Sequence, residues 1–85
     1  MRNIFREELG KNIRNLRHKK NITQETLSLE AHISRSHIAM LETGKRDITV
    51  SLLFQISRAL NVNMREIFSF DDIEKYKFDV EKFYQ

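Results

Sequence analysis

The 85-residue sequence contains no cysteine, no proline and no tryptophan, and it has only two glycines. The absence of cysteine excludes disulfides, thiolate metal ligands and cysteine nucleophiles, and it fits a protein of the reducing cytoplasm. Sheets joined by tight turns need glycine, which accepts a positive φ, or proline, which fixes φ in advance. The scarcity of glycine and the absence of proline therefore favour helices. No apolar run approaches the roughly 20 residues that span a bilayer, and no charged-then-apolar leader follows Met1, so we expect neither a membrane partner nor export.

Charge is distributed unevenly along the chain, whose net charge is +3. Residues 1–20 hold seven Lys and Arg against two Glu, residues 21–70 are balanced, and residues 71–85 hold five acids against three lysines. A basic patch can dock on phosphates and release counterions. A solvated helix face has the same composition, so charge alone does not assign a function.

The spacing of the apolar residues predicts an all-α fold of five helices followed by a shorter sixth. The first helix is expected to end near Lys19–Asn21. The expected N-caps of the next four helices are Thr23, Ser34, Thr49 and Asn63. The second and third helices are short and meet across the residues from Ala31 to Ile33, which is the spacing of a helix-turn-helix unit.

Residues 71–85 contain the last expected element, a short amphipathic helix. The apolar residues at helical spacing in this segment are Ile73, Tyr76, Val80, Phe83 and Tyr84. About fourteen residues make a marginal helix in isolation, so we expect the segment to pack on the rest of the chain or on a second copy. We therefore divide the chain into a domain over residues 1–70 and a carboxyl-terminal tail over residues 71–85.

One set of residues, within about residues 8–68, carries a family resemblance. The set comprises Ile13-Arg14-Asn15-Leu16-Arg17, Ile22-Thr23-Gln24-Glu25, Leu27, Ala31, Ile33-Ser34-Arg35-Ser36, Ile38, Leu41-Glu42, Gly44-Lys45-Arg46, Leu53, Ile56, Ala59-Leu60 and Val62. The sequence resembles the Cro/repressor-type (Xre-like) helix-turn-helix family of prokaryotic and phage transcription regulators. The resemblance implies a lambda-repressor-like DNA-binding domain that binds a palindromic operator in double-stranded DNA as a homodimer.

More than one specific function is compatible with this resemblance. The short length, the Ser34-Arg35-Ser36 start and the Gly44-Lys45-Arg46 run look most like the controller proteins of restriction–modification systems. Small phage repressors and antitoxins share the same residues. The alternative to a DNA-binding regulator is an antitoxin-like or adaptor module whose main partner is another protein. The apolar residues near the carboxyl end would form the surface for that partner.

The resemblance implies that about residues 34–43 form a recognition helix in the major groove. The implied base contacts are Arg35, Ser36, His37, Ala39 and Met40. A guanidinium can bond O6 and N7 of guanine together, which favours Arg35 as the main base contact over a phosphate contact or a solvated side chain. Ser36 and His37 suit a base edge or a phosphate, and Met40 suits only a thymine methyl or a structural role.

The implied contacts to the DNA backbone surround this helix. They are Gln24, Ser34, Lys45, Arg46 and Thr49. Gln24 and Thr49 stand at helix starts, where free amide groups attract phosphate, although simple capping would also explain them. Lys45 and Arg46 lie in the loop that follows the recognition helix, and the alternative for both is an ordinary charged loop.

One match to the family and two departures from it concern structure more than DNA. The family pairs an arginine near the end of its first helix with a glutamate at the end of the recognition helix, and Arg17 and Glu42 stand at the matching positions. His32 occupies the turn where the family usually has glycine, which predicts a positive φ at a residue with a Cβ. Ser28 replaces a common alanine at a close helix contact, where its hydroxyl needs a hydrogen bond.

The apolar residues near the end of the domain exceed what one small domain can hide. We expect them to form the interface of a homodimer, as a two-fold operator demands. These residues are Val62, Met64, Ile67, Phe68 and Phe70.

An enzyme is not expected. Nucleophilic catalysis needs an elbow such as G-x-S-x-G or a nucleophile beside a histidine and an acid, and the chain supplies neither. His32 and His37 do not share a helix face, so no metal site is expected, and no glycine-rich phosphate loop or other cofactor site is evident. We expect no cofactor and no small-molecule ligand, and a cytoplasmic location at the nucleoid.

Overall fold

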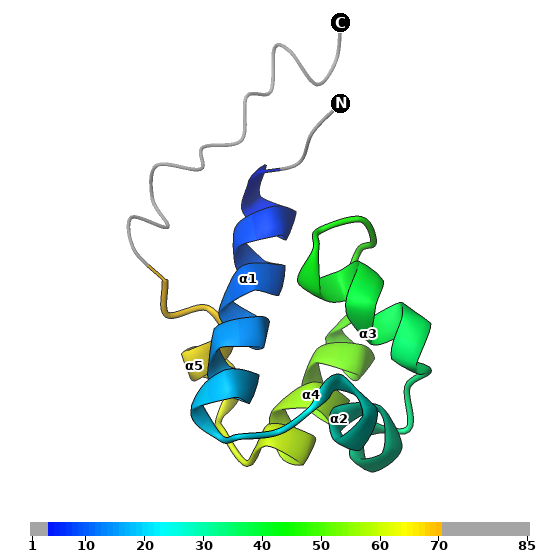
Figure 1. Cartoon of the computed structure of the whole chain (residues 1–85). Helices are drawn as coiled ribbons and strands as arrows, with labels where there is room; N and C mark the ends of the chain where they lie inside the picture. The colour runs from blue at the N-terminus through cyan, green and yellow to red at the C-terminus, as the bar shows by residue number, and fades with distance from the viewer. Residues whose placement is uncertain (1–3, 71–85) are drawn as a thin grey trace, which may run out of the picture.

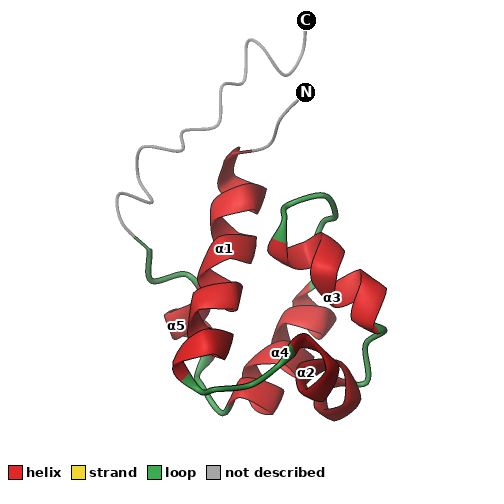
Figure 2. Cartoon of the chain, viewed as in Figure 1, coloured by secondary structure: helices red, strands yellow, loops and turns green. Residues whose placement is uncertain are grey.

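The computed structural model describes residues 4–70. Within this range the chain forms five α-helices and no strand, which confirms the all-α prediction (Figure 2). The helices are α1 (Ile4–Lys19), α2 (Gln24–Ala31), α3 (Arg35–Glu42), α4 (Val50–Leu60) and α5 (Met64–Ile67). None of them is long and apolar enough to cross a membrane. The expected sixth helix and the tail over residues 71–85 lie outside the described residues.

Four helices begin at the side chains that the sequence marks as caps. Thr23, Ser34, Thr49 and Asn63 each accept a hydrogen bond from a backbone N–H in the first turn of the following helix. At α5, Glu66 also accepts the N–H of Asn63 at 3.1 Å, which completes a capping box. Such caps satisfy N–H groups that a helix start otherwise leaves unpaired, so they define where α2 to α5 begin.

Left-handed residues follow α1, α2 and α4. Asn21, His32 and Asn61 have φ of 56°, 59° and 55°. Asparagine tolerates this conformation because its short polar side chain bonds locally, whereas His32 bears the strain that the sequence predicts, of about 1 kcal/mol or more. The chain therefore reverses direction at these positions without glycine.

The turn between α2 and α3 is held by two side chains. The Ser28 hydroxyl donates to the carbonyl oxygen of Ile33 at 2.5 Å, which supplies the hydrogen bond this serine needs. Gln55 Nε2 on α4 donates to the carbonyl oxygen of Ala31 at 2.8 Å. The Ser28 bond closes the turn on α2, and the Gln55 bond satisfies a carbonyl that the end of α2 leaves open and ties the turn to α4.

One apolar core joins all five helices. Its buried residues are Leu9, Ile13, Leu27, Ala31, Ile33, Ile38, Leu41, Leu53, Ile56, Leu60 and Ile67. In Figure 1, α2 and α3 lie to one side of α1, and α5 lies against its other side. Phe5 is partly exposed near the start of α1, where its ring lies 6.0 Å from that of Phe70.

Helices α1 and α3 lie close together at Gly10. A Cβ at this position would overlap the carbonyl oxygen of Leu41 and lie 2.9 Å from the carbonyl carbon of Glu42. Only hydrogen fits in this space, so Gly10 sets how closely α3 lies on α1.

Candidate nucleic-acid interface

Helices α2 and α3 form a helix-turn-helix unit in which one face of α3 is fixed and the other is free. The residues His32 to Ser34 connect them, and Ile33 is buried below the turn. Ile38 and Leu41 point from α3 into the core and are each 1% exposed. Because these two residues determine the rotation of α3 about its axis, the positions on the opposite side of the helix are directed away from the core.

The expected base contacts differ in how far their side chains are exposed. Arg35 and Ser36 are exposed in the first turn of α3, and Met40 is partly exposed one turn further on. His37 and Ala39 are half-buried. Within residues 4–70 the guanidinium of Arg35 forms no ion pair. It is therefore available to an external acceptor.

A buried ion pair holds the carboxyl end of α3 on α1. Arg17 Nε lies 2.7 Å from Glu42 Oε2, and Arg17 Nη2 donates to Glu42 Oε1 at 3.0 Å. Arg17 Nη1 also donates to the carbonyl oxygen of Ile22 at 2.9 Å. Among the described residues no buried polar side-chain atom lacks a hydrogen bond. The pair is therefore fully satisfied, which is the condition under which buried charges are tolerated.

Gln24 belongs to the same network. Its Nε2 donates to Glu42 Oε1 at 3.1 Å, so the first residue of α2 is tied to the last residue of α3. The residue is half-buried at the helix start. Any contact of this side chain with a DNA phosphate is therefore made from a position that Glu42 holds.

The two hydroxyl residues expected at the DNA backbone both serve as caps. Ser34 Oγ accepts the N–H of His37 at 3.2 Å and lies 3.5 Å from Ser36 Oγ. Thr49 Oγ1 accepts the N–H of Leu52 at 3.1 Å. Both residues are exposed, so each cap lies at the protein surface.

The loop between α3 and α4 carries Lys45 and Arg46, which are both exposed. Its first part is bonded to α3, because the N–H of Lys45 donates to the carbonyl oxygen of Met40 at 2.9 Å. Arg6 on α1, which the sequence analysis did not single out, donates from Nε to the carbonyl oxygen of Gly44 at 2.9 Å. No local pattern marks Arg6, since its partner lies 38 positions away in the sequence.

The expected dimer residues differ in their accessibility. Val62, Met64 and Phe70 are half-buried and Phe68 is exposed, so each offers some surface. The prediction is wrong for Ile67, which is fully buried in the core of its own chain and offers no surface to a partner. Its side chain falls on the inward face of α5, the face that packs on α1 and α4.

The structure adds two exposed apolar residues that the sequence analysis did not assign to an interface. Val50 and Phe54 on α4 are 76% and 54% exposed. Their spacing of four along α4, to one side of the buried Leu53 and Ile56, is the signal that marks a second apolar face. Phe54 lines a pocket together with Val62.

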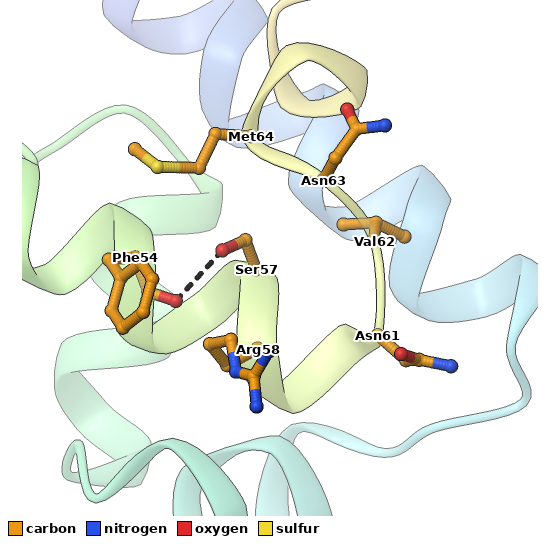
Figure 3. Close-up of a pocket in the computed structure, with 7 residues that line it drawn as sticks. All are labelled: Phe54, Ser57, Arg58, Asn61, Val62, Asn63 and Met64. Atoms are coloured by element: carbon orange, nitrogen blue, oxygen red, sulfur yellow. Dashed lines mark hydrogen bonds between the residues drawn. The ribbon is translucent and has the colours of Figure 1, made fainter.

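An open pocket of about 380 Å³ lies between the end of α4 and the start of α5 (Figure 3). Its lining residues are Phe54, Ser57, Arg58, Asn61, Val62, Asn63 and Met64. The Ser57 hydroxyl donates to the carbonyl oxygen of Phe54 at 2.8 Å and is thereby satisfied within its own helix. The pocket is lined by both apolar and polar side chains and is open to solvent.

No metal centre is found in the part of the chain that the structure describes. No three His, Asp or Glu side chains of residues 4–70 gather closely enough to hold an ion.

Comparison with known proteins identifies the family. The sequence profile of the helix-turn-helix family matches residues 13–67. The chain belongs to this family. Among its relatives, control protein C.BamHI of Bacillus amyloliquefaciens is 32% identical over 74 residues, which are 86% of this chain and 91% of that protein. An HTH-type transcriptional regulator of Archaeoglobus fulgidus is 35% identical over 65 residues, which are 76% of this chain and 92% of the relative.

Solved structures agree with this family. The restriction–modification controller protein C.AhdI from Aeromonas hydrophila matches with a TM-score of 0.72 at 31% identity, over 73% of this chain and 94% of that one. The restriction–modification controller protein C.Esp1396I matches with a TM-score of 0.74 at 25% identity, over 79% and 87% of the two chains. This helix-turn-helix protein thus has relatives that are named as HTH-type transcriptional regulators and as control proteins.

Proposed function

We propose that this helix-turn-helix protein is a sequence-specific transcriptional regulator that binds a palindromic operator as a homodimer. The observation that carries the proposal is the exposure of Arg35 and Ser36 at the start of α3, while Ile38 and Leu41 anchor the opposite face. The major groove is about 12 Å wide and admits one such helix. A helix fixed on one face and polar at its free first turn suits that groove.

The exposed side chains of α3 suggest a division of roles in base recognition. The planar fork of Arg35 matches O6 and N7 of guanine. Ser36 and His37 can bond a base edge or a phosphate, and Ala39 and Met40 supply apolar surface for a thymine methyl. Sequence preference would then rest mainly on Arg35.

The DNA backbone would be held on both sides of this helix. Lys45 and Arg46 in the loop supply two cations, and Ser34 and Thr49 place hydroxyls and helix amides at the surface. Gln24 would add a contact at the start of α2. Such contacts determine register and affinity but carry no sequence information.

We infer further that the protein is a controller of a restriction–modification system. Support comes from relatives of matching length that are named control proteins and from two solved controller structures. The genomic neighbourhood tests this assignment. Adjacent endonuclease and methyltransferase genes would support it, whereas adjacent phage or toxin genes would contradict it. We propose that it acts at the nucleoid in the cytoplasm.

Two alanine substitutions separate the proposed base contact from a proposed backbone contact. On duplexes selected from a randomised pool, Arg35→Ala is expected to weaken binding by about 1–3 kcal/mol and to relax the preference at one base pair. Lys45→Ala is expected to weaken all sequences alike and to flatten the salt dependence by about one unit of slope. Gel shifts over a series of salt concentrations measure both. Full selectivity in Arg35→Ala would overturn its role as a base contact, and an unchanged salt slope in Lys45→Ala would overturn its role as a backbone contact.

The homodimer is proposed to form through α5 and the neighbouring apolar face of α4. Support comes from the exposed apolar residues there, Val50, Phe54 and Phe68, and from the adjoining pocket. Burying this surface against a second copy would remove apolar area from water. It would also relate the two recognition helices by the two-fold symmetry of a palindrome.

A charge placed in this face tests the dimer. Phe68→Glu is expected to give monomers in sedimentation, because an unpaired carboxylate cannot be buried between two copies. Phe54→Glu is expected to act in the same direction. Leu29→Glu is the matched control, since Leu29 is also exposed but lies on α2. A dimer that persists in both phenylalanine variants would move the interface elsewhere.

A further inference from the structure

The loop that carries Lys45 and Arg46 is fastened to the first turns of α1 by one arginine. Arg6 Nε donates to the carbonyl oxygen of Gly44 at 2.9 Å, and Arg6 Nη1 lies 2.9 Å from Asp47 Oδ1. The two partners flank the loop cations in the sequence. One guanidinium therefore holds the loop at both ends of the segment that would face phosphates.

The backbone of the loop also lies directly on α1. Gly44 has φ of 73°, and a Cβ at this position would lie 2.6 Å from Glu7 Cα. The loop can approach this closely because glycine has no side chain and accepts a positive φ. The position of the loop is thus set by contact with α1 as well as by its bonds to α3.

The two members of the ion pair differ in exposure. The Arg6 side chain is 27% exposed, whereas that of Asp47 is 84% exposed. The arginine is therefore the anchored partner, and the aspartate extends from the loop surface. An exposed pair of this kind adds little to folding stability, typically below about 1 kcal/mol, so its value must be sought in another property.

That property is the charge of the loop. Asp47 follows Lys45 and Arg46 directly, and all three are exposed. An unpaired carboxylate here would repel DNA phosphates, because charges closer than about 8 Å are only partly screened at physiological salt. Arg6 cancels this carboxylate and leaves the two cations of the loop unopposed.

We propose that Arg6 is a positioning residue for DNA binding. It holds the loop of residues 43–49 so that Lys45 and Arg46 face the phosphates, and it neutralises Asp47 there. This inference rests on the proposed function, because it assigns a role within the same DNA-binding surface. Arg6 acts through the loop: in the complex its guanidinium stays bonded to Gly44 and Asp47 and does not contact a phosphate.

The test uses the full-length chain and a labelled duplex of mixed sequence, about 30 base pairs long, in anisotropy titrations at several salt concentrations. Arg6→Gln is expected to lower affinity by roughly three- to tenfold, with little change in the free energy of unfolding. Arg6→Lys keeps the charge but loses the two-pronged bonding, so an intermediate loss is expected.

Two backgrounds distinguish positioning from direct contact. With Asp47→Asn present, Arg6→Gln is expected to cost less, because no carboxylate is left to neutralise. With Lys45→Ala present, the penalty is also expected to shrink, because the residue that Arg6 positions has been removed. An arginine that bound phosphate directly would show the same penalty in every background, and this result would overturn the proposal.

The outcomes also separate this inference from the proposed function. A wild-type protein that does not bind the duplex in a salt-dependent manner contradicts the function itself. A wild-type protein that binds, with Arg6→Gln binding equally well, overturns the positioning role alone. If Arg6→Gln is poorly folded, the comparison of Arg6→Lys with and without Lys45→Ala supplies the same test, and equal penalties for Arg6→Lys in the two backgrounds overturn the role.

Discussion

Gly10→Ala is expected to lower the free energy of unfolding by about 3 kcal/mol or more, as a backbone-level case of overpacking. The added methyl would overlap the carbonyl oxygen of Leu41, which is backbone and cannot rotate away. Helices α1 and α3 would have to separate, and the buried contacts of Ile38 and Arg17 would be disturbed with them.

The sign of this effect is diagnostic, because alanine is favoured over glycine in helix interiors by about 1 kcal/mol. Asn15→Ala, at an exposed position of the same helix, is the matched control and is expected to be neutral or slightly stabilising. Urea unfolding followed by circular dichroism measures both variants. A Gly10→Ala protein as stable as the parent would show that α1 and α3 do not approach as described.

Breaking the buried ion pair is expected to have the other large effect. Arg17→Met leaves the Glu42 carboxylate buried without its main partner, and Glu42→Leu leaves the Arg17 guanidinium in the same position, so each is expected to cost about 3–5 kcal/mol. The double variant, which removes both charges, is expected to cost much less than the sum of the two single changes. DNA affinity should fall in the single variants only as far as the folded fraction falls.

A double-mutant cycle measured by chemical unfolding checks this prediction. Arg14→Met is the control for loss of one cation from α1, because Arg14 is exposed on the same helix and is expected to change stability little. Strict additivity of the Arg17 and Glu42 changes would contradict a coupled pair. It would assign their effects to packing instead.

The elements of this fold that obey local rules could be predicted from the sequence. Thr23, Ser34, Thr49 and Asn63 cap helices because their side chains bond N–H groups only a few residues away. Asn21 and Asn61 end helices for an equally local reason. The outward position of Ser36 follows from helical spacing once Ile38 and Leu41 are taken as the inward residues, and Arg35 is exposed beside it in the first turn of α3.

The contacts that could not be predicted join distant parts of the chain. Nothing near Gly10 or Arg6 indicates the backbone of Leu41 or Gly44 as a neighbour, because these contacts depend on how two helices cross. Asn12 is a further case, since its Nδ2 donates to the carbonyl oxygens of Glu66 and Ile67 at 3.0 and 2.6 Å. Ile67 is a related case. Helix α5 has only four residues, so the spacing of its apolar residues could not show which of them face inward.

Helix α1 is held on both flanks, by Gly10 and Arg17 against α3 and by Asn12 against α5. The element proposed to enter the groove and the element proposed to join two copies therefore share one rigid support. In such a dimer the protein dictates the distance between the two half-sites. A duplex whose helical repeat does not match must twist or curve to fit, so base pairs at its untouched centre would influence affinity through their stiffness.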